Sequence, residues 1–440
     1  MPDQVSSSPI RRVRSGFRVL VLARSVLPLH GYGGLERHVG DLVSYLLRSG
    51  SGVTLITRPP SPHRAQGGDA LNDERAFLSQ PHLDVRFVPY RTFPLAGRRG
   101  TTVVDRSLAY PWFGRRAGRL AAALIAEGHA QIVHGLGASA LGYAAARRRD
   151  PQGTVPLVFN PQGLEEFGAA GMIDVTAKLK RLAYRPLRRA VRACATAADR
   201  IIATDRVLEP AVLQHLRVPA DRVRIVPNAI DLDACRSLAS PEDGERLRRR
   251  IGCDPDVPLL VSAGRVERNK GFHVLLESLA GMTDRPWLWA LVGDGPFRPR
   301  LERLIAERRL GSRVLLPGRV VDRELHGWYE AASIFVHPTL YEGSSLVTLE
   351  AMSHGRAVVA TRAGGLPDKV EHGVNGWLVA PGQPVELRRA LEDALSDVSR
   401  LKRMGMESRR IVSEQFSWQT VINRLLEVYA ELLPDRVLAP

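Results

Sequence analysis

Short apolar runs alternate with amphipathic stretches along almost the whole chain, a pattern typical of parallel α/β sheets. The first half places such runs, which predict buried strands, at 17–23, 53–57, 85–88, 132–134, 157–159 and 201–204. The second half begins the pattern afresh, with predicted strands at 259–263, 288–292, 314–316, 334–336, 357–361 and 376–379. We therefore expect two doubly wound domains in tandem, whose strand carboxyl ends face each other across a cleft.

This pattern gives provisional domain boundaries. We expect a disordered basic tail at 1–16, a first domain at 17–235 and a second domain at 236–416, with a C-terminal helix at about 417–435 that packs back onto the first domain. Residues 59–82 are predicted to form a long surface loop. A helix is predicted at 173–196, which Pro186 should kink or split.

The composition predicts a protein with two domain cores and without a membrane-spanning helix. A chain of 440 residues with 44% hydrophobic residues can fill two domain cores, and it contains no run of about 18 apolar residues that would predict a membrane span. Its three cysteines are widely spaced, which predicts neither a disulfide framework nor a metal site and favours a reduced cytoplasm.

The positive charge lies mainly in the first half. Residues 1–235 hold 33 basic and 19 acidic residues, whereas residues 236–440 hold 29 and 27. Two stretches dominate: residues 86–119, where arginines are mixed with aromatic residues, and residues 178–206. One predicted helix face there carries Lys178, Arg181, Arg185, Arg188 and Arg192. Such a balance suits an anionic membrane, an anionic substrate or a nucleic acid, although no nucleic-acid-binding motif is present.

The stretch 341–355 carries the most chemistry. It follows an apolar strand and reads as a loop that enters a short helix, which Ser344 or Ser345 can cap and Gly355 can end. A phosphate would bind at the helix start. Glu342 in the loop and Glu350 in the helix suit hydrogen bonds from hydroxyl groups of a sugar or a ribose.

Polar and glycine residues also follow other predicted strands, where open α/β sheets bind ligands. Gly33 and Gly34 lie between the first strand and helix, at a spacing that does not match the dinucleotide fingerprint. His134 ends a predicted strand, and Gln162 follows another. Asp231 and Asp233, like Asp254 and Asp256, have the spacing of metal-dependent transferases, but we interpret both pairs as helix caps or surface residues.

Taken together, these motifs resemble the family 4 glycosyltransferases, which are retaining enzymes with the two-domain GT-B fold. The resemblance covers roughly residues 17–435. Its motifs, in order, are Gly33-Gly34-Leu35-Glu36, Val226–Asp231, Gly264–Gly271, Val292–Gly295, Glu342 with seven residues to Glu350, Gly364-Gly365 and Gly373–Gly376.

The resemblance implies a role for each motif. Arg265 and Lys270 would stabilise the diphosphate leaving group of a nucleoside diphosphate sugar, most simply UDP- or GDP-linked. Glu342 would lie beside the donor sugar and Glu350 would bind the ribose. The remaining donor-binding positions would be Gly33, Gly34, Gly264, Arg319, Val320, Gly343, Ser344, Ser345, Leu346 and Val347. No metal and no cofactor would be needed.

Two departures from the family pattern concern the first domain and the turn after Gly365. His134 stands alone where many relatives have a pair of histidines, and Gln162 stands where a histidine is common, so either residue is a candidate for substrate contact. Asp368 replaces the usual glutamate.

The predicted function is therefore sugar transfer to a glycan or lipid-linked acceptor, by an enzyme in the cytoplasm or at the inner face of the plasma membrane, where its basic residues would contact anionic lipid. Two alternatives stay open. One is a nucleotide-sugar 2-epimerase of the same fold, and the other is a non-enzymatic binder of an anionic polymer.

Overall fold

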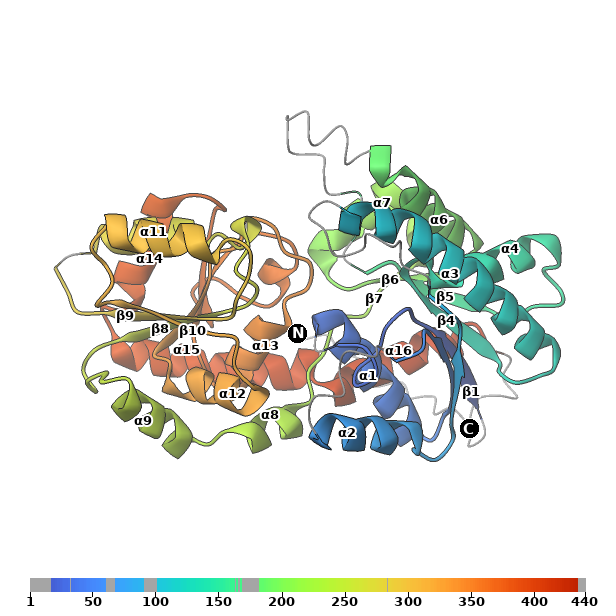
Figure 1. Ribbon diagram of the computed structural model, residues 1–440, viewed down its shortest axis with the longest axis horizontal. Coiled ribbons are helices and arrows are strands. Elements are labelled where there is room, and N and C mark those ends of the chain that lie inside the picture. The colour runs from blue at the N-terminus through green and yellow to red at the C-terminus, as the bar shows by residue number, and fades with distance from the viewer. Residues whose placement is uncertain are drawn as a thin grey trace, which may run out of the picture. The chain divides into compact units, whose positions relative to one another are not determined.

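The computed structural model describes residues 17–31, 33–60, 68–90, 101–162, 164, 167, 182–282 and 284–433. The chain forms two compact units (Figure 1). The first contains the chain up to Thr204, Glu209–Val226 and the chain from Val421 onward, and the second contains Asp205–Leu208 and Pro227–Thr420. The predicted basic tail lies outside the described residues.

The first unit is built on a seven-stranded parallel sheet with the order β3-β2-β1-β4-β5-β6-β7. Its strands are β1 (Arg18–Leu22), β2 (Gly52–Thr57), β3 (Leu83–Phe87), β4 (Ile132–Leu136), β5 (Leu157–Asn160), β6 (Arg200–Ala203) and β7 (Val223–Ile225). Strand β1 is central and pairs with both β2 and β4, with Val19 opposite Val53 on one side and Ile132 on the other. The chain direction across the sheet therefore reverses between β1 and β4.

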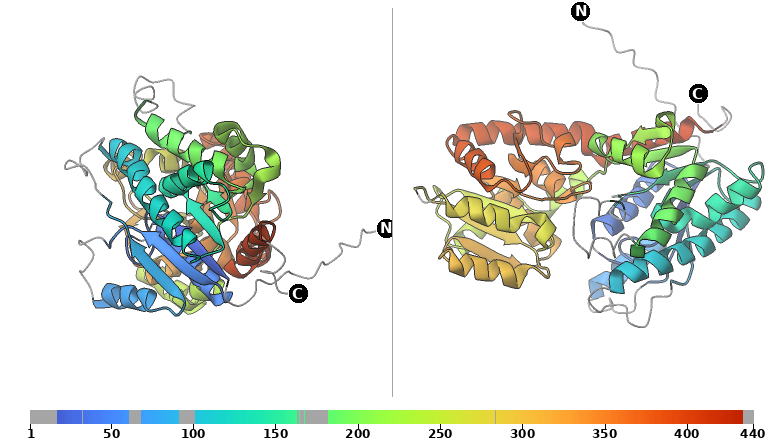
Figure 2. Two further views of the ribbon diagram at one scale, coloured as in Figure 1. Left: turned by 90° about the vertical axis from the view of Figure 1, so that its right-hand side faces the viewer. Right: turned by 90° about the horizontal axis from the view of Figure 1, so that it is seen from above.

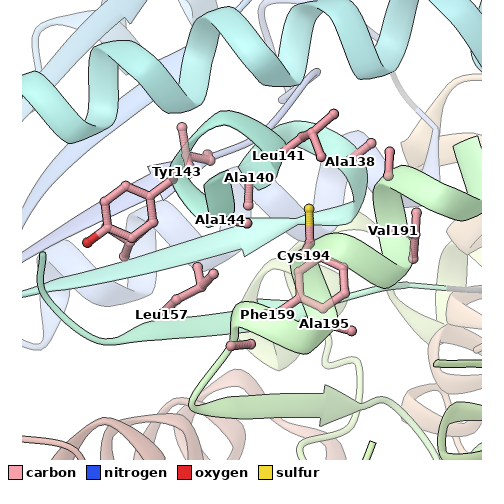
Figure 3. Packing of buried hydrophobic residues seen from close by; sticks show 14 of the residues in the cluster. Ala138, Ala140, Leu141, Tyr143, Ala144, Leu157, Phe159, Val191, Cys194 and Ala195 are labelled. Atoms are coloured by element: carbon pink, nitrogen blue, oxygen red, sulfur yellow. The ribbon is translucent and has the colours of Figure 1, made fainter. Parts of the chain in front are cut away.

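Helices cover the sheet of the first unit. They are α1 (Gly34–Arg48), α2 (Gly68–Leu78), α3 (Thr101–Ala126), α4 (Leu141–Arg149), α6 (Arg185–Ala197) and α7 (Glu209–Leu216). One core cluster joins Leu20 and Leu22 of β1 to apolar residues of α3, α4 and α6. Cys194 lies fully buried among these apolar side chains, and burial raises the pKa of its thiol, which makes it an inert packing residue (Figure 3).

Several local predictions for the first half are wrong. The predicted loop at 59–82 contains helix α2, because its sequence is rich in helix-forming residues and Phe77 is buried. The predicted split of the helix at Pro186 is confirmed instead: helical residues 182 and 183 are followed by a turn at Tyr184, and α6 begins at Arg185 with Pro186 in its first turn, where a missing N–H costs nothing. Strand β7 was not predicted at all. His134 lies in the middle of β4, because the strand continues through two further buried residues.

The second unit has a six-stranded parallel sheet with the order β10-β9-β8-β11-β12-β13. Its strands are β8 (Leu259–Ala263), β9 (Leu288–Val292), β10 (Val314–Gly318), β11 (Ile334–His337), β12 (Val358–Thr361) and β13 (Gly376–Val379). Its helices are α8 (Leu232–Leu238), α9 (Pro241–Arg250), α10 (Phe272–Ala280), α11 (Arg298–Glu307), α12 (Asp322–Ala331), α13 (Leu346–Ser353), α14 (Pro384–Ala394) and α15 (Val398–Ile411).

Both faces of this second sheet are buried. Leu259 and Val261 of β8 join a cluster with residues of α9, α12 and α13, whereas Leu260 joins a cluster with residues of α10, α11 and α14. Figures 1 and 2 show the helices of this unit on the two sides of its sheet. Burial on both faces explains why these strands read as continuous apolar runs.

The boundaries differ from those expected. The second unit begins at Pro227 rather than 236, because α8 packs on α12 and α13 of that unit. Residues 205–208 also belong to the second unit, although the chain on either side belongs to the first. Helix α16 (Trp418–Ala430) follows a π-helical turn at Val412–Phe416, and the chain from Val421 onward belongs to the first unit. Among the described residues, no helix is long and apolar enough to cross a membrane.

Candidate active site

Loop 338–345 and helix α13 place the predicted chemistry at the carboxyl end of β11. Ser345 is the N-cap of α13, and its hydroxyl accepts a hydrogen bond from the Thr348 amide at 3.3 Å. Helix α13 ends at Ser353 with His354 as its C-cap, and Gly355 follows with φ +69°, a conformation that favours glycine. The amides of Leu346 and Val347 in the first turn have no acceptor within the helix, so the helix start is suited to an anion.

Glu342 is the centre of a charged cluster. Lys270 Nζ and His337 Nε2 each lie 2.8 Å from Glu342 Oε2, and the Gly343 amide donates to Glu342 Oε1 at 3.1 Å. Burial raises the pKa of Glu342, but the hydrogen bonds and charges of His337 and Lys270 outweigh it and hold the pKa well below its usual range. Glu342 is therefore a carboxylate with fixed orientation.

His337 was missed by the sequence analysis. Its Nε2 faces the Glu342 carboxylate, while its Nδ1 lies 3.0 Å from Thr348 Oγ1, which in turn lies 2.9 Å from the Ser345 hydroxyl. Because a carboxylate only accepts, Nε2 must carry the proton that it donates. His337 thus connects Glu342 to the cap of α13. Its place at the last residue of β11 was the signal that could have revealed it.

Two backbone contacts fix the position of the loop that carries Glu342. The Leu340 amide donates to Asn269 O at 2.7 Å, which joins this loop to the loop that carries Lys270. Behind it lies Gly364 with φ +53°, where a Cβ atom would be 1.9 Å from Glu342 O. A side chain at position 364 would displace Glu342, which explains the Gly364-Gly365 turn physically.

Glu350 lies within α13 and only 3% of it is exposed. The hydroxyl of Tyr329 in α12 donates to Glu350 Oε2 at 2.9 Å. The Tyr329 ring is itself buried and stacks at 28° on His354, with 5.9 Å between ring centroids. Tyr329 therefore fixes the orientation of the Glu350 carboxylate, and the sequence analysis did not predict this residue.

The remaining residues that were predicted to act on the donor lie in both units of the chain. Arg265 lies outside the Glu342 cluster: its side chain is 70% exposed and pairs with Glu267 at 3.0 Å. Gly264 has φ +140°, and Gly318, with φ +82°, precedes Arg319 and Val320 at the carboxyl end of β10. Gly33 and Gly34 belong to the first unit, at the start of α1, where Gly33 is the N-cap residue without a capping side chain. Their part in donor binding stays a prediction.

His134 has an environment typical of a structural residue. It is buried within β4, its Nδ1 lies 2.7 Å from the hydroxyl of Tyr429, and burial lowers its pKa to about 3. Asn160 Oδ1 accepts from the amide of Gln162, which has a positive φ of 65°. A substrate contact of His134 or Gln162 stays a prediction.

Acid should destabilise the first unit through its buried histidines. Burial lowers the pKa of His30 and His38 to about 4 and that of His134 to about 3. Because these values lie below the unfolded value of about 6.5, the unfolded chain binds protons first. The contribution of these histidines to the free energy of unfolding should therefore be fully present above pH 6.5. It should be lost as the pH falls toward 4, and each histidine should lower the free energy of unfolding by at most about 1.4 kcal/mol for each pH unit.

The measurement is the midpoint of thermal unfolding at pH 7.5, 6.5 and 5.5, where few carboxylates titrate. His134→Gln should show a smaller decrease than the parent protein. Equal midpoints at the three pH values would contradict the buried neutral state of these histidines.

The first Asp-x-Asp pair contains a helix cap. Asp231 is the N-cap of α8, and its carboxylate accepts from the Ala234 amide at 2.9 Å, as we interpreted it. Within the part of the chain that the structure describes, no group of three or more His, Cys, Asp or Glu side chains is arranged to hold a metal ion.

The basic stretches differ from the expected Arg-aromatic surface. Phe113 is fully buried and is not available for a surface contact, whereas Tyr110 is partly buried and its hydroxyl donates to Leu136 O at 2.9 Å. Arg192 is also used internally, since it donates to His215 O at 2.8 Å. Part of the predicted stretches, including Lys178 and Arg181, lies outside the described residues. The exposed basic side chains of α3 and α6 are Arg115, Arg116, Arg119, Arg185 and Arg189.

The fold of the chain is similar to that of several solved structures. A HepE structure from Anabaena, determined in complex with UDP, shares the fold with a TM-score of 0.69 at 22% identity, over 94% of this chain and all of that one. Sucrose-phosphate synthase from Thermosynechococcus elongatus gives a TM-score of 0.71 at 22% identity, over 95% and 99% of the two chains. The fold is that of the GT-B glycosyltransferases.

Sequence comparison identifies the family. Residues 32–234 match the model described as Glycosyltransferase Family 4, and residues 257–397 match the model described as Glycosyl transferases group 1. A D-inositol 3-phosphate glycosyltransferase of Xylanimonas cellulosilytica is 30% identical over 438 residues, which span 96% of this chain and 98% of that protein. The chain belongs to the family 4 glycosyltransferases, and it is a sugar-transferring enzyme rather than a binding protein or an epimerase.

Proposed function

We propose that the enzyme transfers a sugar from a nucleoside diphosphate sugar to an acceptor with retention of anomeric configuration and without a metal ion. The observation that carries this proposal is the cluster of Glu342, Lys270 and His337 near the start of α13, where the amides of Leu346 and Val347 have no acceptor within the helix. The HepE structures in complex with UDP and with UDP-glucose support a donor of this chemical class.

In this proposal, one part of the site would bind the diphosphate of the donor and another part would contact its sugar. The first-turn amides of α13 would bind the diphosphate, and Lys270 would stabilise the negative charge that grows on it as the anomeric bond breaks. Glu342, held by His337, would accept a hydrogen bond from the donor sugar or stabilise positive charge on its anomeric carbon. The leaving phosphate oxygen would take the acceptor proton on the same face of the sugar, which gives retention without a separate base.

The donor class can be tested directly. We expect one of the UDP-, GDP- and ADP-sugars to raise the midpoint of thermal unfolding, because a ligand that binds the folded state stabilises it. The same ligand should release its nucleoside diphosphate only when an acceptor is added, with undiminished rate in EDTA. No shift with any nucleotide sugar, or activity that requires added Mn²⁺ or Mg²⁺, would contradict the proposal.

Glu350→Ala should weaken binding of the donor by roughly 1–3 kcal/mol, because the hydroxyls of a bound ribose would lose their acceptor. The measurement is the dissociation constant of the nucleoside diphosphate by calorimetry. Tyr329→Phe is the matched control: it keeps the carboxylate but removes its support, and should cost less. Unchanged affinity of Glu350→Ala would exclude the ribose role.

The acceptor is proposed to be a glycan or a lipid-linked glycan presented at an anionic membrane surface. Exposed arginines on α3 and α6 support such contact by electrostatic attraction alone, at about 1 kcal/mol for each basic residue near the surface. We expect the protein to sediment with liposomes that contain anionic lipid at low salt and to be released by about 0.5 M salt, since the attraction is screened. Equal recovery with neutral liposomes would contradict this.

A further inference from the structure

The first unit contains an arginine at its topological switch point that no predicted role explains. Arg24 follows β1, and β1 and β4 are the neighbouring strands between which the chain direction across the sheet reverses. Open α/β sheets bind ligands at the carboxyl ends of the strands at this point. Arg24 is half-buried and, among the described residues, pairs with no carboxylate.

Two tyrosine rings hold the guanidinium of Arg24. Its Cζ lies 4.8 Å from the ring centroid of Tyr110 and 5.8 Å from that of Tyr90. Tyr110 is fixed in turn, because its hydroxyl donates to Leu136 O at 2.9 Å and lies 3.2 Å from Ser139 Oγ. Gly137 gives this hydroxyl room, since a Cβ atom there would be 2.5 Å from it. The guanidinium is thus positioned by packing against these two rings.

A second guanidinium lies at the same edge of the sheet. Arg58 follows β2, and its Cζ is 5.7 Å from the ring centroid of Tyr90, so Arg24 and Arg58 share one ring. The charges affect neighbouring groups. Burial and then Arg58 lower the pKa of His30 to about 4, while Arg24 and Arg106 oppose the rise that burial causes in the pKa of Tyr110. This edge of the sheet is therefore strongly positive.

From this geometry we infer that Arg24 forms a binding site for a phosphate group of the acceptor, and that the charge of Arg58 beside it adds to the attraction. Stacking on a ring uses the face of a guanidinium and leaves its N–H groups, which lie in the plane, to donate to oxygens. Arginine donates two parallel hydrogen bonds to a phosphate, and such charge-assisted bonds are stronger than neutral ones. The acceptor would then be a phosphorylated compound, a class that the name of the D-inositol 3-phosphate glycosyltransferase also contains.

This inference rests on the proposed function, because it assigns the phosphate to the acceptor. The same chemistry would recognise a phosphate of the donor, which is the alternative source. The two sources can be separated because the donor diphosphate is assigned to α13 of the second unit. Saturation with the nucleoside diphosphate should occupy that site and leave the Arg24 site accessible to a further phosphate.

The experiment is a titration of the full-length protein with inorganic phosphate, followed by ³¹P line broadening, with and without saturating nucleoside diphosphate. We expect the phosphate to bind in both conditions, and Arg24→Gln to weaken its binding in the presence of nucleotide at least tenfold. Arg48→Gln is the matched control, because Arg48 stacks on Tyr45 at 4.7 Å but lies at the end of α1. It should leave phosphate binding unchanged.

Arg24→Lys retains the charge and should retain part of the binding, and thermal unfolding of each variant shows whether it folds. Loss of phosphate binding on nucleotide saturation, or equal binding by the parent and Arg24→Gln, would overturn the inference. The affinity for the nucleotide tests the proposed function separately. If Arg24→Gln loses phosphate binding but binds nucleotide normally, the result supports both the proposed donor class and the phosphate site at Arg24. If no nucleoside diphosphate binds, the proposed function fails, and the titration without nucleotide still tests Arg24.

Discussion

Lys270→Ala is expected to lower kcat about 10²–10³-fold while the affinity for the nucleoside diphosphate changes only a few-fold. The leaving diphosphate gains charge mainly as the anomeric bond breaks, so a cation placed beside it stabilises the transition state more than the bound donor. Lys270 is placed by its 2.8 Å contact with Glu342 Oε2, and its side chain is only 22% exposed. Its removal also leaves Glu342 without its nearest positive charge.

Two further variants show whether this effect is specific. Arg268→Ala removes an exposed cation two residues away in the same loop and should leave kcat nearly unchanged. Arg265→Ala should lower kcat, as the family resemblance implies, although Arg265 pairs with Glu267 in this structure. The measurement is initial-rate kinetics beside nucleotide calorimetry. Equal losses in affinity and in turnover for Lys270→Ala would mean that Lys270 binds the ground state and does not act on the leaving group.

Lys369→Ala should destabilise the second unit by about 3–5 kcal/mol, because it leaves the Asp205 carboxylate buried without its cation. The two side chains are fully buried, with Lys369 Nζ 2.6 Å from Asp205 Oδ1. Lys369 also donates to Ser344 Oγ and Gly365 O at 3.1 Å each. All three donors of the ammonium are thus used, and one of them supports the loop of Glu342.

A double variant distinguishes the stability that depends on the ion pair from the stability that depends on the packing around it. Lys369→Met combined with Asp205→Leu removes both charges and should recover most of the lost stability, because apolar pairs of similar volume often replace buried ion pairs without cost. The test is the midpoint of thermal unfolding for both single variants and the double variant. Additive losses in the double variant would show that the two charges do not depend on each other.

The sequence predicted the parallel sheets well because strands buried on both faces appear as continuous apolar runs. Most of the first sheet and all of the second were found in this way. Strand β7 was missed because it has only three residues and contains Arg224. Helix α2 was missed because proline, glycine and polar residues before it favoured a loop, while Phe77 alone signals the buried side of the helix.

Charge contacts between distant positions could not be predicted. The sequence placed Glu342 and Lys270 in one site only through the family resemblance, since 72 residues separate them. Nothing in the local sequence distinguishes Lys369 from a surface lysine, or shows that Asp205 would lie beside it. The buried Phe113 lies in the stretch 86–119 that was expected to form an Arg-aromatic surface, because arginines flank it and periodicity alone does not show which side of a helix packs on the sheet.

The central claim is that the second unit binds the donor at the start of α13 and at the loop that carries Lys270. Hydrogen exchange of the full-length protein with saturating nucleotide sugar tests this most directly, because it reports on backbone amides and needs no acceptor. We predict slower exchange in residues 343–350 and 264–271, where the amides would bind or cover the diphosphate. Strong protection elsewhere, with exchange in these two segments unchanged by the nucleotide sugar, would contradict the account.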